Sequence, residues 1–147
     1  MRAVIQRVSQ AKVEVDNKIV GQIGTGLLAY LGVAGGDGLK DAQFIAQKLV
    51  NLRIFSDQDG KMNKSVIDVG GAVLLISNFT LQADCRKGRR PGFDAAAEPE
   101  LAQQLYEKTA ELIGQMGLRV EKGVFAAHMH VSSINDGPGT FILDSKS

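Results

Sequence analysis

Apolar and polar positions alternate along the first part of the chain in the way antiparallel strands require. Segments 2–8 and 11–15 show this alternation, which predicts strands with one buried face. Asp16-Asn17 supplies turn-forming residues, and the pattern resumes over 18–23 as a further strand. Segment 27–33 is apolar throughout, which predicts a central strand covered on both faces.

Two segments carry apolar residues at helical spacing. The first runs from Leu39 to Leu52, and the second begins near Pro99 and ends near Gly117. Proline suits the first turn of a helix, because its missing N–H would have no partner there in any case. Both segments keep polar residues on the opposite face, so we expect two amphipathic helices packed on a sheet.

The apolar run Ala72–Ile76 is followed directly by Ser77-Asn78-Phe79-Thr80-Leu81. The run predicts a strand buried on both faces, and the polar residues at its end would project from a rigid support, where sites are commonly built. Shorter strands are expected over 53–55, 118–123, 125–134 and 141–144. Together these elements predict one α+β domain over residues 1–147, with a mainly antiparallel, barrel-like sheet and two helices.

Composition narrows the class of protein without defining a function. Hydrophobic residues make up 44% of the chain and charged residues 22%, which is ordinary for a globular domain. The single cysteine, Cys85, excludes an intramolecular disulfide and fits a reducing compartment. No apolar run reaches membrane-spanning length, and charge interrupts the N-terminus too early for a signal peptide. The net charge of +1 indicates no global attraction to nucleic acid.

A local cluster of charge is present all the same. Arg86, Lys87, Arg89 and Arg90 place four basic residues in five positions, with glycine and proline around them. This cationic loop (86–90) has two interpretations. It is either a solvated loop or a contact to a phosphate backbone.

Histidines and hydroxyl residues offer two further chemistries. His128 and His130, on one face of the expected strand, would form half of a zinc site, but no third ligand can be identified from the spacing. Ser77, His128 and Asp84 have the residue types of a catalytic triad, although triads are defined by geometry. A structural role for these residues is favoured over both the zinc site and the triad.

We call Gly137-Pro138-Gly139 the Gly-Pro segment. The proline ring fixes its own φ, while the glycine on each side can adopt backbone conformations that other residues rarely do. On local grounds a hairpin turn is favoured. The alternative is a backbone that approaches another surface closely, or that contains a cis Gly-Pro bond.

Taken together, these residues resemble the D-aminoacyl-tRNA deacylase family from end to end. The family signature Ser-Gln-Phe-Thr-Leu is seen here as 77–81 with Asn78 at its second position, and Gly-Pro-Val-Thr is seen as 137–140 with Gly139 at its third. Similarity also covers segments 1–8, 53–57, 60–63, 90–93 and 131–136.

The resemblance implies a cytoplasmic homodimer, without metal or organic cofactor, that hydrolyses the ester between a D-amino acid, or glycine, and the terminal ribose of tRNA. It implies that Gly137 and Pro138, joined by a cis bond, enter the partner subunit's active site and reject L side chains. Ser77 and Thr80 would be the catalytic residues, with Thr80 the only direct participant. Asn78 and Phe79 would bind substrate, while the ribose 2′-hydroxyl assists the attacking water.

Under this resemblance the cationic loop becomes a contact to the tRNA acceptor stem. The two departures from the family pattern predict specific changes. Asn78 is one methylene shorter than glutamine, and Gly139 loosens the backbone beside the filter, so we expect less stringent rejection of L substrates. Two rival functions remain open: a catalytically silent RNA-binding member of the fold, and a metal-dependent hydrolase using the two histidines.

Overall fold

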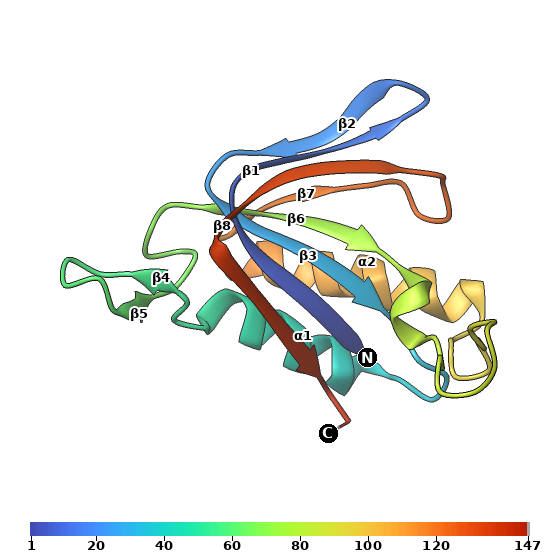
Figure 1. Cartoon of the computed structure of the whole chain (residues 1–147). Coiled ribbons are helices and arrows are strands. Elements are labelled where there is room, and N and C mark those ends of the chain that lie inside the picture. The colour runs from blue at the N-terminus through green and yellow to red at the C-terminus, as the bar shows by residue number, and fades with distance from the viewer. Residues whose placement is uncertain (147) are drawn as a thin grey trace.

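A long first strand organises the sheet in the computed structural model, which describes residues 1–146 (Figure 1). This strand pairs antiparallel with three others. The four strands are β1 (Arg2–Val15), β2 (Lys18–Ile23), β3 (Gly26–Gly32) and β8 (His130–Asp144). The two strands predicted over 2–8 and 11–15 are therefore one, because β3 pairs along its first half, β2 along its second, and β8 along nearly all of it.

The remaining strands make the sheet mixed. Its order is β2-β1-β3-β6-β7, with β8 on β1, and both the β3–β6 and β6–β7 pairs are parallel. Parallel neighbours need a long crossover, which the two predicted helices provide. The elements are α1 (Leu39–Asn51), β6 (Ala72–Ser77), the 3₁₀ helix η1 (Phe79–Gln82), α2 (Pro99–Gln115) and β7 (Arg119–Lys122). Both α-helices cover the same face of the sheet (Figure 1).

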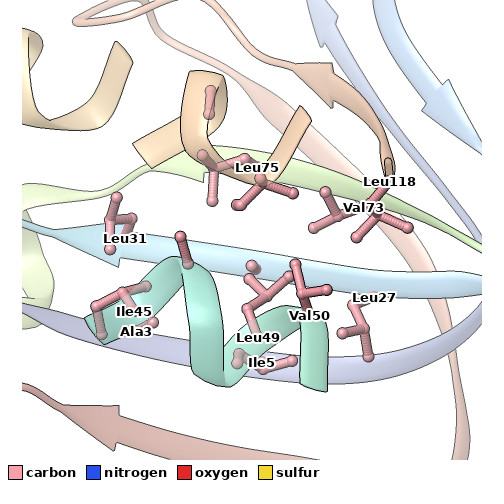
Figure 2. Close-up of a cluster of buried hydrophobic side chains, with 14 of the residues drawn as sticks. Ala3, Ile5, Leu27, Leu31, Ile45, Leu49, Val50, Val73, Leu75 and Leu118 are labelled. Carbon is pink, nitrogen blue, oxygen red and sulfur yellow. The ribbon is translucent and has the colours of Figure 1, made fainter. Parts of the chain in front are cut away.

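Apolar side chains fill two layers, one on each face of the central strands. Between helices and sheet, Leu27 and Val73 pack with Leu49 of α1 (Figure 2). Their neighbours Leu28 and Leu74 point to the other face, into a second cluster inside the curled sheet. This alternation confirms the prediction that the segments 27–33 and 72–76 are buried on both faces.

The sheet curls until its two ends approach each other, which gives the barrel-like core. A Cβ at Gly21 of β2 would lie 2.7 Å from the carbonyl oxygen of Lys122 of β7, so only glycine fits this close approach. The Arg119 guanidinium donates to the Gln22 carbonyl over 3.2 Å across the same gap. The sheet is thus nearly closed, as expected from the sequence.

Three local predictions were wrong, two in their boundaries and one in the kind of structure. The strand expected over 53–55 is β4 (Phe55–Ser56), paired with β5 (Met62–Lys64). The strand expected over 125–134 begins only at His130, because a turn at 124–127 precedes it. The hairpin turn favoured at the Gly-Pro segment is instead a shift of register within β8. Within residues 1–146, none of the helices has the length and apolar character needed to cross a membrane.

Candidate active site

A cavity of about 560 Å³ opens where β3 and β6 end. Its walls come from the ends of both strands, the start of α2, the turn at 124–127 and the start of β8. The main lining side chains are Tyr30, Ile76, Tyr106, Phe125, Met129 and Val131. Such a mainly apolar cavity with a few polar groups at one side is typical of a small-molecule or substrate-end site.

Three of the predicted site residues, Ser77, Asn78 and Phe79, line this cavity. The β6 strand delivers them there, and the Asn78 N–H donates to the Leu31 carbonyl over 2.8 Å, which ties the strand end to β3. The structure therefore brings the first signature to a cavity wall. Thr80 follows on η1 and is exposed.

Asn78 caps the 3₁₀ helix with its side chain. Its Oδ1 accepts from the Thr80 N–H at 3.3 Å and also from the Thr80 hydroxyl. The hydroxyl of Thr80 therefore donates to an amide oxygen, which is not a base, and among residues 1–146 no carboxylate or imidazole is hydrogen-bonded to it to activate it as a nucleophile. The backbone N–H of Phe79 opens this helix, and the first N–H groups of a helix have no partner in a preceding turn.

Two residues that sequence reasoning missed fix this short helix in place. Gln82 is buried and its amide donates to the Gly32 carbonyl over 2.9 Å. Arg2 donates to the Leu81 carbonyl over 2.9 Å and pairs with Asp144. The sequence does show a glutamine directly after the signature, although it does not show that this side chain is buried. Arg2 gave no such signal, because it lies 79 residues from Leu81 in the chain.

Two tyrosines in the cavity wall stay neutral. Burial raises the pKa of Tyr30 above its ordinary value. Burial, and secondarily the charge of Glu107, raises the pKa of Tyr106, whose hydroxyl donates to the Leu75 carbonyl over 2.7 Å. Neither phenol therefore supplies negative charge to the cavity near neutral pH.

The cationic loop lies beyond η1 and is closed at its base by two hydrogen bonds between Asp84 and Gly92, of 2.8 and 2.9 Å. Arg86 makes a bidentate pair with Asp84, and its hydrogen bonds lower the pKa of that carboxyl to about 2. Within residues 1–146, Lys87, Arg89 and Arg90 form no ion pair, and all are exposed. Three of the four predicted phosphate-contacting side chains are thus available, and Arg86 is already neutralised.

The Gly-Pro segment contains a cis bond between Gly137 and Pro138. Arg7 braces it by donating to the Asp136 carbonyl at 2.9 Å and to the Ile54 carbonyl at 2.6 Å. The Gly139 N–H donates to the Asn135 side chain at 2.8 Å. Sequence reasoning missed both Arg7 and Asn135 as supports of this segment.

This segment does not line the cavity of its own chain. Along β3, Leu31 faces Ser77, while Gly26 and Asn135 both face Val8 of β1. The two signatures are therefore offset by about five residues along the strand direction, or roughly 16 Å at 3.3 Å per residue, and they also lie three strands apart across the sheet. Figure 1 shows the bend of β8 near β4, at the opposite end of the sheet from η1.

The structure gives little support to the zinc site or to the catalytic triad. The rings of His128 and His130 lie 5.2 Å apart, but His128 precedes the strand, and residues 1–146 hold no group of three potential metal ligands. The Asp84 carboxylate accepts hydrogen bonds from Arg86 instead. No hydrogen bond joins Ser77, His128 and Asp84 to one another in that part of the chain, so the geometry provides no triad.

Comparison with known proteins identifies this fold. A solved structure described as a probable eukaryotic D-amino acid tRNA deacylase shares the fold, with a TM-score of 0.81 and 17% identity over 97% of each chain. A second, named c-Myc DNA Unwinding Element Binding Protein, superposes with a TM-score of 0.94 and is 37% identical over the whole of both chains.

The fold is thus that of the tRNA deacylases, and the sequence relationships are closer. The family model for D-Tyr-tRNA(Tyr) deacylase matches residues 4–144. Proteins named D-aminoacyl-tRNA deacylase from Fervidobacterium nodosum and Anaeromyxobacter dehalogenans are each 57% identical over 99% of this chain and 98% of their own length. The chain belongs to the D-Tyr-tRNA(Tyr) deacylase family, and it is a hydrolase.

Proposed function

We propose that the cavity hydrolyses the ester linking a D-amino acid, or glycine, to the 3′-terminal ribose of tRNA. The observation that carries this proposal is the apolar cavity walled by Ser77, Asn78 and Phe79, in a chain whose relatives are named D-aminoacyl-tRNA deacylases. The cavity accommodates the aminoacyl group, and the exposed rim beside η1 accommodates the terminal nucleoside. Because aminoacyl-tRNA is a substrate of translation, this assigns the enzyme to the cytoplasm.

Ester hydrolysis needs an attacking water and a donor for the oxyanion of the tetrahedral intermediate. In this proposal the Phe79 N–H, at the open end of η1, serves as that donor. Thr80 holds its hydroxyl on Asn78, which favours a positioning role for Thr80 over nucleophilic attack. The substrate's own 2′-hydroxyl then assists the water, and Ser77 and Phe79 position the ester.

The Gly-Pro segment supplies the stereochemical filter from a second copy of the chain. Its offset of roughly 16 Å from Ser77 along the strand direction, together with three strand spacings across the sheet, supports insertion into the site of a partner. Gly137 has φ +135°, which only glycine adopts readily, and Arg7 joins the backbone just before it, at Asp136, to the Ile54 carbonyl. A rigid carbonyl pair excludes an L side chain, and glycine passes because it has none.

Mixed dimers test where the filter acts. One protomer carries Phe79→Pro, which removes the backbone N–H proposed as the oxyanion donor at a position where a helix tolerates proline, and the other carries Gly137→Ala, which disrupts its filter. If the filter acts on the partner's site, the intact site faces an intact filter and L-tyrosyl-tRNA is spared. Cleavage of the L ester by the mixed dimer would place the filter within its own chain and contradict the proposal.

The cationic loop contacts the acceptor stem through Lys87, Arg89 and Arg90. These three exposed cations follow η1 by only a few residues, so a stem that places its 3′ end in the cavity passes over them. Arg86 contributes less, because its charge is already paired with Asp84.

A second candidate is a nucleic-acid-binding member of the fold without turnover. It is favoured by the 37% identical structure named as a DNA unwinding element binding protein, and by the engagement of the Asn78 amide oxygen with Thr80. Single-turnover deacylation of matched D- and L-tyrosyl-tRNA, with glycyl-tRNA and a chelator control, separates the two. Rapid loss of the D and glycyl esters supports the hydrolase, whereas binding of tRNA without cleavage of any ester supports the second candidate.

A further inference from the structure

An aromatic pair, Phe79 and Phe93, stands exposed beside the cavity. Phe79 is 58% exposed and Phe93 is 38% exposed, with ring centroids 5.0 Å apart and an interplanar angle of 57°. Neither ring belongs to the two clusters of buried side chains. Two large apolar rings kept together on the surface favour a binding role over a packing role.

The backbone fixes Phe93 at the junction between the cationic loop and the cavity. The Asp84–Gly92 hydrogen bonds, which close that loop, end one residue before it. After it, the Phe93 carbonyl accepts from the Ala96 N–H over 3.1 Å, and Ala96 lines the cavity. Phe93 therefore lies on the line from the exposed cations to the ester-binding cavity.

A tRNA 3′ end crosses this junction as a single strand, because its last nucleotides are unpaired. Unpaired bases stack on exposed aromatic rings, and the interaction tolerates any base, since every base has a π face. We propose that Phe93, backed by Phe79, stacks the base of the nucleotide that precedes the aminoacylated terminal nucleoside. This inference rests on the proposed function, and it adds a binding subsite outside the cavity that holds the reacting ester.

The test compares substrates that differ only in how far they extend past the reacting ester. These are D-tyrosyl esters of adenosine, of the trinucleotide CCA and of full tRNA. For Phe93→Ala the ratio of kcat/KM on CCA to kcat/KM on adenosine falls about 5- to 100-fold, the range that aromatic-to-alanine changes at stacked bases produce. Phe93→Tyr keeps a stacking face and retains the ratio, whereas Phe93→Leu, which is apolar without a π face, loses it.

The matched control is Phe44→Ala. Phe44 is 36% exposed on α1, under the ammonium of Lys48. The substitution therefore removes a similar ring from another part of the surface. This control leaves the ratio at its wild-type value. An equal loss on adenosine and CCA in Phe93→Ala leaves the ratio unchanged, and it would reduce Phe93 to a support for the cavity wall and overturn the subsite. No loss on either substrate would overturn the subsite as well.

A binding measurement keeps the subsite testable if no ester is cleaved. CCA carrying 2-aminopurine at its middle position loses fluorescence when that base stacks, and the chain contains no tryptophan to interfere. Quenching by the wild type but not by Phe93→Ala supports the subsite even where the hydrolase proposal fails. Equal quenching by both proteins, or no quenching by either, overturns the subsite while leaving the hydrolase proposal untouched.

Discussion

Replacing Gly137 with alanine tests the rigidity of the Gly-Pro segment, because two costs arise together. The residue has φ +135°, where a non-glycine residue costs about 1–3 kcal/mol. An added Cβ would lie 2.4 Å from an Nη atom of Arg7, which is too close for that guanidinium to stay in place.

Arg7 has little freedom to move away from a new Cβ. It donates to the Asp136 and Ile54 carbonyls over 2.9 and 2.6 Å, and losing one such bond from a charged donor costs about 1.5–3 kcal/mol. Since the contact to Asp136 is exposed, we take the lower end of the hydrogen-bond cost and expect a total of about 2.5–4.5 kcal/mol. At about 2–4 °C per kcal/mol for a chain of this size, Tm falls by roughly 5–18 °C.

Two variants separate the causes. Gly60→Ala carries strain alone, because Gly60 has φ +77° with open space around it. Gly139→Ala carries a contact to Arg7 alone, at 3.2 Å and without positive φ. Thermal unfolding, combined with the ratio of L- to D-tyrosyl-tRNA deacylation, is measured for all three. The reasoning fails if Gly137→Ala matches Gly60→Ala in Tm and keeps the wild-type ratio of L to D cleavage.

Three further outcomes are expected. Gly139→Val restricts the backbone beside the filter, and we expect it to lower the ratio of L- to D-tyrosyl-tRNA cleavage; an unchanged ratio would count against a loosened filter. Neutralising Lys87 and Arg89 together reduces the slope of log binding constant against log salt by about 1.4–1.8, and an unchanged slope would return the cationic loop to a solvated role. Tyr106→Phe removes the 2.7 Å donor of the Leu75 carbonyl, which keeps the Gly123 N–H at 3.3 Å, and so lowers the free energy of unfolding by about 0.5–1.5 kcal/mol. Urea unfolding measures the change, and no loss would contradict a stabilising role for this hydroxyl.

The local pattern was sufficient for the elements themselves. The run Ala72–Ile76 appears as β6, and both helical spacings appear as α1 and α2 within about two residues. These succeeded because a strand buried on two faces and an amphipathic helix each impose their own spacing on the sequence. The signature 77–81 was recognisable for a similar reason, since polar residues at the end of such a strand stand out.

Pairing over long separations was not visible in the same way. The parallel β3–β6 pair, the continuity of β1 and the brace from Arg7 to Asp136 all depend on partners far along the chain. Segment 125–129 has the alternation of a strand, yet a turn at 124–127 overrides it, where Phe125 packs against Tyr106. Tertiary contacts decided these cases, and no single stretch of sequence records them.

The ladder between β1 and β8 also constrains the order in which the protein matures. The ribosome makes β1 first, yet the neighbour that covers most of its length is built from residues more than 110 positions later. Until β8 emerges, nascent chains expose an unpaired strand edge that can recruit the same edge of another chain. The Gly-Pro segment lies within β8, so under the proposed function the part that rejects L substrates is synthesised last. A chain stalled before β8 is made would carry the Ser77 end of the site without the Gly-Pro segment.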